Sequence, residues 1–73
     1  MKSKRKLLEQ MVDDVQLQIL GNEVNTRTLK KKVENNDELE RAYADKLVQL
    51  SQEREARIEQ LDTLKEMLEE ADE

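Results

Sequence analysis

The sequence lacks the residue types from which most catalytic and metal sites are built. Its 73 residues include no Cys, His, Pro, Phe or Trp, and only one Gly and one Tyr. Without Cys there is no disulfide, thiol nucleophile or thiolate metal site, and without His there is no imidazole to act as base or ligand. The serine hydroxyls of Ser3 and Ser51 have no imidazole to activate them. We therefore expect no enzymatic activity and no cofactor.

Long apolar segments are also missing. No run approaches the roughly 18 apolar residues that a membrane-spanning helix needs. The basic start at Lys2–Lys6 is followed only by Leu7 and Leu8 before charge returns, which is not the pattern of a signal peptide. We expect no membrane contact and a cytoplasmic location, in the host cytoplasm if the chain is viral.

The residues that are present favour helices. Charged residues make up 42% of the chain and hydrophobic residues 36%, a balance that could also indicate disorder. However, Ala, Leu, Glu, Lys, Arg and Gln dominate, and Leu recurs at helical spacing. Because a lone core seldom stabilises a chain below about 80 residues, association is expected. The predicted fold class is all-α and homo-oligomeric.

Charge divides the chain into two regions. Residues 1–33 hold eight bases and four acids (net +4), whereas residues 34–73 hold five bases and fourteen acids (net −9). We predict a basic helical region over residues 1–36 and an acidic long helix for oligomerisation over 37–73. Only the first would attract a polyanion. The acidic end favours a basic protein partner, or shielding of the positive half, over a metal, since carboxylates along one exposed helix seldom enclose a cation.

The basic region is predicted to form short helices separated by a turn. Its first helix is expected over about residues 3–20, either continuous or divided into 3–12 and 14–20 by a capping box at Asp13. Gly21 suits a helix C-cap, and Asn25 suits the N-cap of a second helix that continues to Val33. The apolar face of the first helix consists of Leu8, Met11, Val12, Val15 and Ile19.

The acidic region is predicted to form one long helix with a heptad stripe. It is expected over about residues 38–70, beginning at an Asp37–Glu40 capping box. Apolar residues alternate at spacings of four and three, which calls for a partner helix in a coiled coil or bundle. Arg54 and Arg57 interrupt the stripe, which favours a bundle, a hairpin or a ring over a dimeric zipper. The predicted oligomer interface comprises Tyr43, Leu47, Leu50, Leu61, Leu64 and Leu68.

The order of helix, glycine turn and capped basic helix is the layout of a helix-turn-helix. Arg and Asn pair with base edges, and Lys neutralises phosphates, so double-stranded DNA is a candidate partner. A solvated helix face explains the same lysines equally well. The predicted nucleic-acid-binding residues are Arg27, Thr28, Lys30, Lys31, Lys32 and Asn35.

Part of the chain resembles a known family. The string from Val24 to Val33 is similar to the recognition helix of bacterial and phage helix-turn-helix proteins. The continuation from Asn36 to Ala44 is similar to a junction in phage small terminase subunits. The resemblance covers about residues 15–45 and implies DNA binding and ring assembly through later helices. Asn22-Glu23 lengthens the turn relative to that motif, and the aromatic residue common in the recognition helix is replaced by Lys31 or Lys32.

Three functions remain open on these grounds. The first is a DNA-binding helical module oligomerised through its C-terminal helix, in phage DNA packaging or in regulation. The second is a coiled-coil structural or assembly adaptor that binds protein and not nucleic acid. The third, weaker possibility is a viral inhibitor that covers a host protein with its acidic helix.

Overall fold

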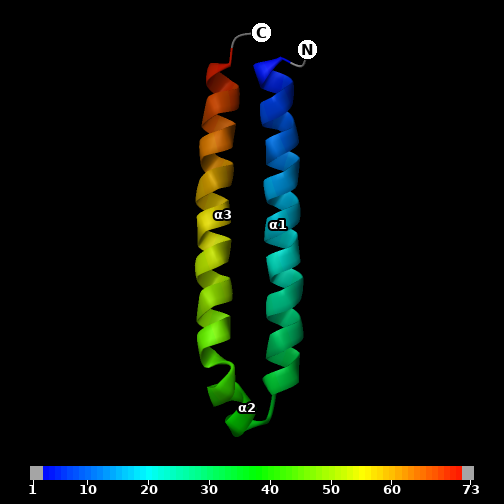
Figure 1. The fold of residues 1–73 in the computed structure, drawn as a ribbon, viewed down its shortest axis with the longest axis vertical. Coiled ribbons are helices and arrows are strands. Elements are labelled where there is room, and N and C mark those ends of the chain that lie inside the picture. The colour runs from blue at the N-terminus through cyan, green and yellow to red at the C-terminus, as the bar shows by residue number, and fades with distance from the viewer. Residues whose placement is uncertain (1–2, 72–73) are drawn as a thin grey trace.

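Two long antiparallel helices make up most of the molecule (Figure 1). The structure is a computed structural model and describes residues 3–71, so Lys2, Asp72 and Glu73 of the predicted basic and acidic ends lie outside the described residues. Helix α1 spans Lys4–Val33, α2 spans Asp37–Ala42 and α3 spans Ala44–Glu70. The described residues contain no strand, which confirms the all-α prediction.

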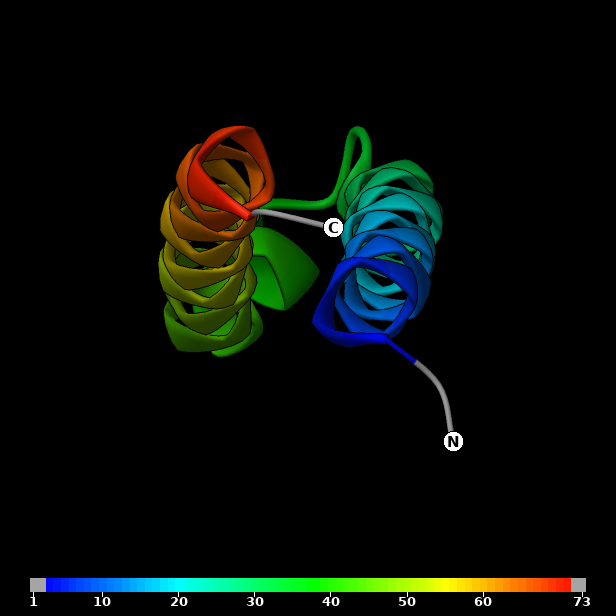
Figure 2. The ribbon, with the colours of Figure 1, turned by 90° about the horizontal axis from the view of Figure 1, so that it is seen from above.

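The hairpin is elongated. Its extents are 54 × 16 × 14 Å, and its radius of gyration is 16.7 Å. A compact chain of this length would have a radius of gyration of about 11 Å. Seen along the helix axes, α1 and α3 lie side by side with no third layer (Figure 2). Each long helix therefore contacts a neighbour on one side only.

The prediction of short N-terminal helices is wrong. Helix α1 runs without interruption through Asp13, Gly21 and Asn25, so the described chain has no helix-turn-helix turn. Gly21 does not have a positive φ angle, as it would at a left-handed C-cap. A glycine inside a helix costs only about 1 kcal/mol relative to alanine. Packing of the residues before and after it in the chain can offset that cost.

That packing comes from a stripe that continues along the whole of α1. Its residues alternate at spacings of four and three, and all of them are buried or half-buried in the hairpin. The polar residues Asn22 and Thr26 occupy two of these positions, so the stripe was not recognised from the sequence. The stripe comprises Leu8, Val12, Val15, Ile19, Asn22, Thr26, Leu29 and Val33.

The heptad stripe of α3 meets the stripe of α1. Leu50 and Leu64 are buried, and Leu61 and Leu68 pack against a cluster that includes Leu8 of α1. Of the bundle, the hairpin and the ring that were predicted for this stripe, the structure shows the hairpin. The leucines predicted to join separate chains face a helix of their own chain, and an oligomer built through them stays a prediction.

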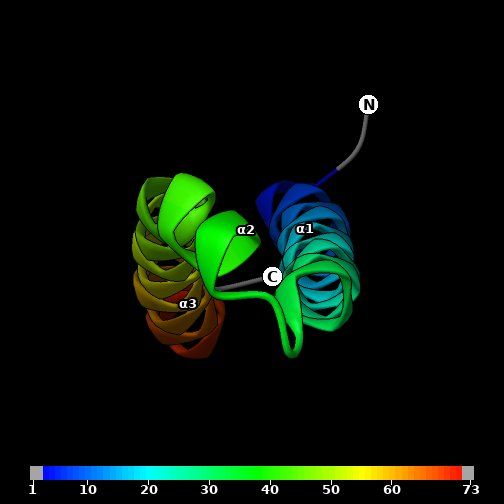
Figure 3. The ribbon, with the colours of Figure 1, turned by 90° about the horizontal axis from the view of Figure 1, so that it is seen from below.

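The connection between the helices differs in detail from the predicted one. Asn36, not Asp37, is the N-cap of α2, and its side chain accepts a hydrogen bond from the Leu39 amide. Asn35 has a φ angle of 61°, a conformation that asparagine tolerates in turns. Helical structure then breaks at Tyr43, so the predicted long helix is divided into α2 and α3. Viewed from below, α2 lies across the end of the hairpin between the long helices (Figure 3).

The apolar core lies mainly toward the open end of the hairpin. Leu8, Val15 and Leu64 form its buried cluster, and partly buried apolar side chains from both helices surround them. Leu50 and Val33 are buried separately, nearer the loop. The stretch between these apolar parts contains polar side chains from both helices.

Candidate interaction surfaces

The predicted DNA-contacting side chains are exposed at the loop end of α1. Arg27, Thr28, Lys30, Lys31, Lys32 and Asn35 are all exposed, while Leu29 is half-buried and Val33 is buried. Leu29 and Val33 therefore point toward the interior of the hairpin, and the six candidate residues point outward. Asn35 lies in the loop and not on the helix that holds the other five residues.

These residues do not form a single basic face. Consecutive residues of a helix point about 100° apart, so Lys30, Lys31 and Lys32 point in three directions. The ammonium group of Lys32 donates a hydrogen bond to the Tyr43 hydroxyl at 3.1 Å and lies 4.8 Å from the ring centroid. Lys30, Lys31 and Lys32 occupy the last turn of α1, where positive charge is favourable beside the free carbonyls of the helix end.

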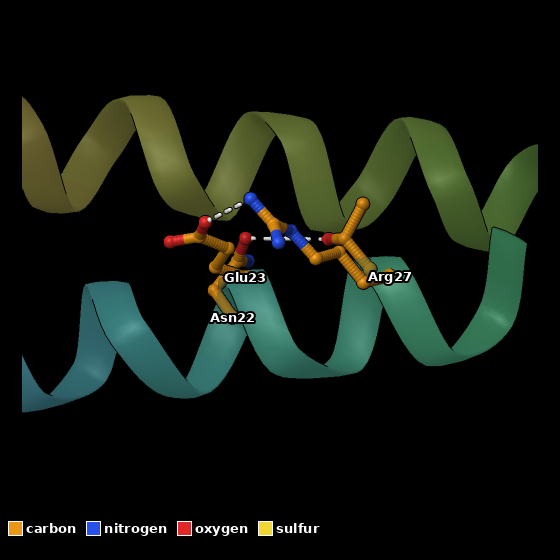
Figure 4. A network of polar contacts seen from close by, with 4 residues as sticks. Asn22, Glu23 and Arg27 are labelled. Atoms are coloured by element: carbon orange, nitrogen blue, oxygen red, sulfur yellow. Dashed lines mark hydrogen bonds and ion pairs between the residues drawn. The ribbon is translucent and has the colours of Figure 1, made fainter.

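Arg27 has a local partner. Its guanidinium lies 2.9 Å from the Glu23 carboxylate one turn earlier, as the dashed line in Figure 4 shows. The Arg27 side chain is 75% exposed, so this ion pair is a surface pair of little energetic weight. Lys30 and Lys31, three and four residues after Arg27, lie on the same side of the helix as Arg27, whereas Lys32 points away from it.

One N-terminal base, Arg5, contacts the acidic end of α3. The Arg5 guanidinium donates a hydrogen bond to the Leu68 carbonyl at 3.4 Å. This carbonyl is near the C-terminus of α3, where the helix dipole is negative. No acid occupies the first turn of α1. The antiparallel arrangement instead places the negative end of α3 beside Arg5.

A polar segment in the middle of the hairpin was missed from the sequence. Asn22 is buried, and its side-chain amide donates a hydrogen bond to the Leu50 carbonyl on α3 at 2.7 Å. The Thr26 hydroxyl donates to the Asn22 side-chain oxygen at 3.4 Å, on the same segment of α1 as the Glu23–Arg27 pair (Figure 4). The heptad spacing of Asn22 from Val15 and Leu29 was the signal that could have identified it.

The two stripe arginines lie beside this polar segment. Arg57 is half-buried and donates a hydrogen bond to the Gln18 side-chain oxygen on α1 at 3.4 Å, whereas Arg54 is exposed. The Nε atom of Arg57 is buried and has no hydrogen-bond partner among the described residues. A shallow groove of about 430 Å³ lies between Gln18, Asn25 and Arg57. Its lining offers no nucleophile with an adjacent base.

A second apolar surface lies on the opposite side of α1 from α3. Leu17, Leu20 and Val24 are 68%, 55% and 55% exposed. Leu17 is two residues from both Val15 and Ile19, which point toward α3, and a two-residue step on a helix turns the side chain by about 200°. We call these three residues the outer ridge. Gly21 lies within it, and open space surrounds the position that a Cβ would occupy.

Other classes of site are not found in the described residues. Residues 3–71 include no group of His, Cys, Asp or Glu side chains arranged to hold a metal ion. None of the helices formed by those residues combines the length and the apolar character needed to cross a membrane.

Comparisons with protein-family models, with curated proteins and with solved structures find no match to this chain. The resemblance to phage small terminase subunits therefore depends on the residues quoted for it alone.

Proposed function

We propose that the protein is a helical-hairpin assembly module that works by binding another helix through the outer ridge. The exposure of Leu17, Leu20 and Val24 is the observation that supports this proposal. Scattered single apolar residues on a surface are ordinary, but three neighbouring ones on one helix face typically mark a contact site. The partner would be an amphipathic helix with an apolar stripe, since such helices bind one another through side chains at this spacing.

The hairpin geometry also supports an assembly role. Only five apolar side chains are buried among the described residues, and α1 and α3 have no third helix to cover their outer faces. Small chains of this kind usually gain stability by association. A partner helix that covers the outer ridge would remove the three most exposed apolar side chains of α1 from water.

Photo-crosslinking in cells that express the chain tests this function. A photoreactive amino acid replaces Leu20 on the outer ridge, and a matched variant bears it at Gln52, which is exposed on α3. Mass spectrometry identifies the crosslinked residues. We expect adducts at position 20 with a defined helical segment and few at position 52. Equal yields at both positions would contradict the proposal.

A DNA-binding module is the second candidate. The observation in its favour is that Arg27, Lys30, Lys31 and Lys32 are all exposed within the last two turns of α1. Each contact with a phosphate would lower the logarithm of the binding constant by about 0.9 per unit of log salt concentration. The continuous helix provides no separate recognition helix, so this candidate depends on charge alone.

Fluorescence anisotropy with labelled duplex DNA at about 50 and 200 mM salt separates the two candidates. The assembly module predicts no binding that weakens steeply with salt. If such binding is found, replacing Lys31 and Lys32 with Glu should abolish it, and replacing Lys46 and Lys65 of α3 with Glu provides a control with the same change in net charge. Salt-sensitive binding lost only in the first variant would establish the DNA-binding candidate.

A further inference from the structure

We propose that the helix bound by the outer ridge is α1 of a second copy of this chain, in antiparallel orientation. This inference rests on the proposed function and names its partner. It follows from a second stripe on α1, from the order of charges along that stripe and from the contrast with α3.

The outer ridge belongs to a stripe with the same alternation of four and three as the inner one. All members of this outer stripe are exposed, and they lie on the side of α1 that faces away from α3. The outer stripe comprises Lys6, Gln10, Asp13, Leu17, Leu20, Val24, Arg27 and Lys31. A helix with two such stripes can pack against α3 and against another helix at the same time.

The apolar part of the outer stripe is nearly symmetric about Leu20. In an antiparallel pair centred there, Leu20 meets Leu20 of the second copy, and Leu17 meets Val24. The same surface serves both chains, as a two-fold interface requires. Gly21 lies next to this centre and has no side chain to hold the two helices apart.

Charge decides the orientation and favours a second copy as the occupant. The acids Asp13 and Asp14 precede the outer ridge, and the bases Arg27 and Lys31 follow it. An antiparallel pair places Asp13 opposite Arg27 of the second copy at both ends of the apolar centre. A parallel pair would place acids against acids and bases against bases, which is unfavourable. The exposed guanidinium of Arg27 retains donors beyond its contact with Glu23.

The equivalent face of α3 does not have these properties. Val48, which is 56% exposed, is the only apolar member of its outer stripe. Acids dominate the rest of that stripe, so two such faces would repel each other. The outer stripe of α3 comprises Asp45, Val48, Gln52, Glu55, Glu59, Asp62, Glu66 and Glu69.

Sedimentation equilibrium from micromolar to millimolar chain concentration measures the association. We expect a reversible monomer–dimer equilibrium for the unaltered chain. Val24→Gln should weaken the dimer about tenfold or more, because both copies lose a buried side chain. Val48→Gln is the matched control, since Val24 and Val48 are 55% and 56% exposed. Equal effects of the two substitutions, or a chain that stays monomeric throughout, would overturn the proposal.

Charge substitutions test the ion pairs with the same readout. Asp13→Lys should weaken the dimer several-fold at low salt, because the introduced ammonium group would face Arg27 of the second copy. Glu55→Lys makes the same change in net charge on the outer face of α3. It should leave the stability of the dimer unchanged or raise it slightly. A stronger dimer with Asp13→Lys would contradict the proposed arrangement.

Disulfide trapping fixes the orientation, and the chain is suited to it because it contains no cysteine. Leu17→Cys and Val24→Cys variants are mixed in equal amounts and oxidised, and mass spectrometry distinguishes the products. The antiparallel register predicts mainly the mixed disulfide between the two variants. Disulfides formed mainly between two copies of the same variant would indicate parallel helices and overturn the proposal.

The two proposals can fail separately. If the chain stays monomeric but crosslinks from position 20 to a helix of another protein, the second copy is wrong as partner and the assembly function stands. If neither association nor a defined crosslink is found, both are wrong.

Discussion

At the residue scale, Asn22 is the polar residue that most directly ties α1 to α3. It is 8% exposed, and its side-chain amide donates to a main-chain carbonyl of the opposite helix. Because a carbonyl can only accept, the contact needs the amide of asparagine. Single buried polar residues of this kind can define the register of two packed helices.

Replacing Asn22 with Asp should therefore destabilise the hairpin. The carboxylate keeps the shape of the side chain but has no donor for the Leu50 carbonyl, and it buries a charge. We expect a loss of about 1–3 kcal/mol in the free energy of unfolding, measured by urea denaturation followed by circular dichroism. Asn25→Asp is the control, since Asn25 is exposed on the same helix. Equal stability of the two variants would show that the contact does not contribute.

Arg57 presents the opposite case. Its buried Nε has no hydrogen-bond partner among the described residues, and its guanidinium makes a long contact with Gln18. Replacing such a group with an apolar side chain is often stabilising. Arg57→Leu should raise the free energy of unfolding by about 1 kcal/mol, whereas Arg41→Leu on exposed α2 should change it by less than about 0.5 kcal/mol. A less stable Arg57→Leu variant would mean that the arginine contributes to packing.

At the scale of the elements, the sequence predicted α3 better than α1. The leucine stripe of α3 is regular enough to be recognised from spacing alone. In α1 the polar residues Asn22 and Thr26 occupy stripe positions, and Gly21 and Asn25 resemble caps. Local preferences therefore indicated a turn, whereas contacts with a helix about 30 residues away favoured continuation. Such contacts, which override local preference, are not visible in a local pattern.

Gly21→Ala distinguishes a continuous α1 from the predicted turn. In a helix interior with open space around the missing Cβ, alanine should stabilise the hairpin by about 1 kcal/mol. At a left-handed C-cap the same substitution would destabilise it. Thermal unfolding followed by circular dichroism, at one low chain concentration, measures the sign. A lower melting temperature for the alanine variant would contradict the continuous helix.

At the scale of the whole molecule, folding mixes charges that are separate in the sequence. The basic half and the acidic half become neighbouring helices, and Arg5 contacts the acidic end of α3. The candidate DNA-contacting residues are exposed, but Lys30, Lys31 and Lys32 point in three directions, as consecutive residues of any helix do. The outer ridge was not predicted, because Leu17 lies off the predicted apolar face of the first helix.

The central claim is that a continuous α1 folds back on α3 within one chain. Pulsed electron spin resonance between labels at Glu9 and Lys65, both exposed near the open end, tests it directly in the cysteine-free chain. The labelled chain is diluted with unlabelled chain so that only distances within one molecule contribute. Helix axes about 8–10 Å apart predict a label separation below about 25 Å. An acidic helix that extends away from the basic region would place the labels more than about 40 Å apart, which would contradict the hairpin.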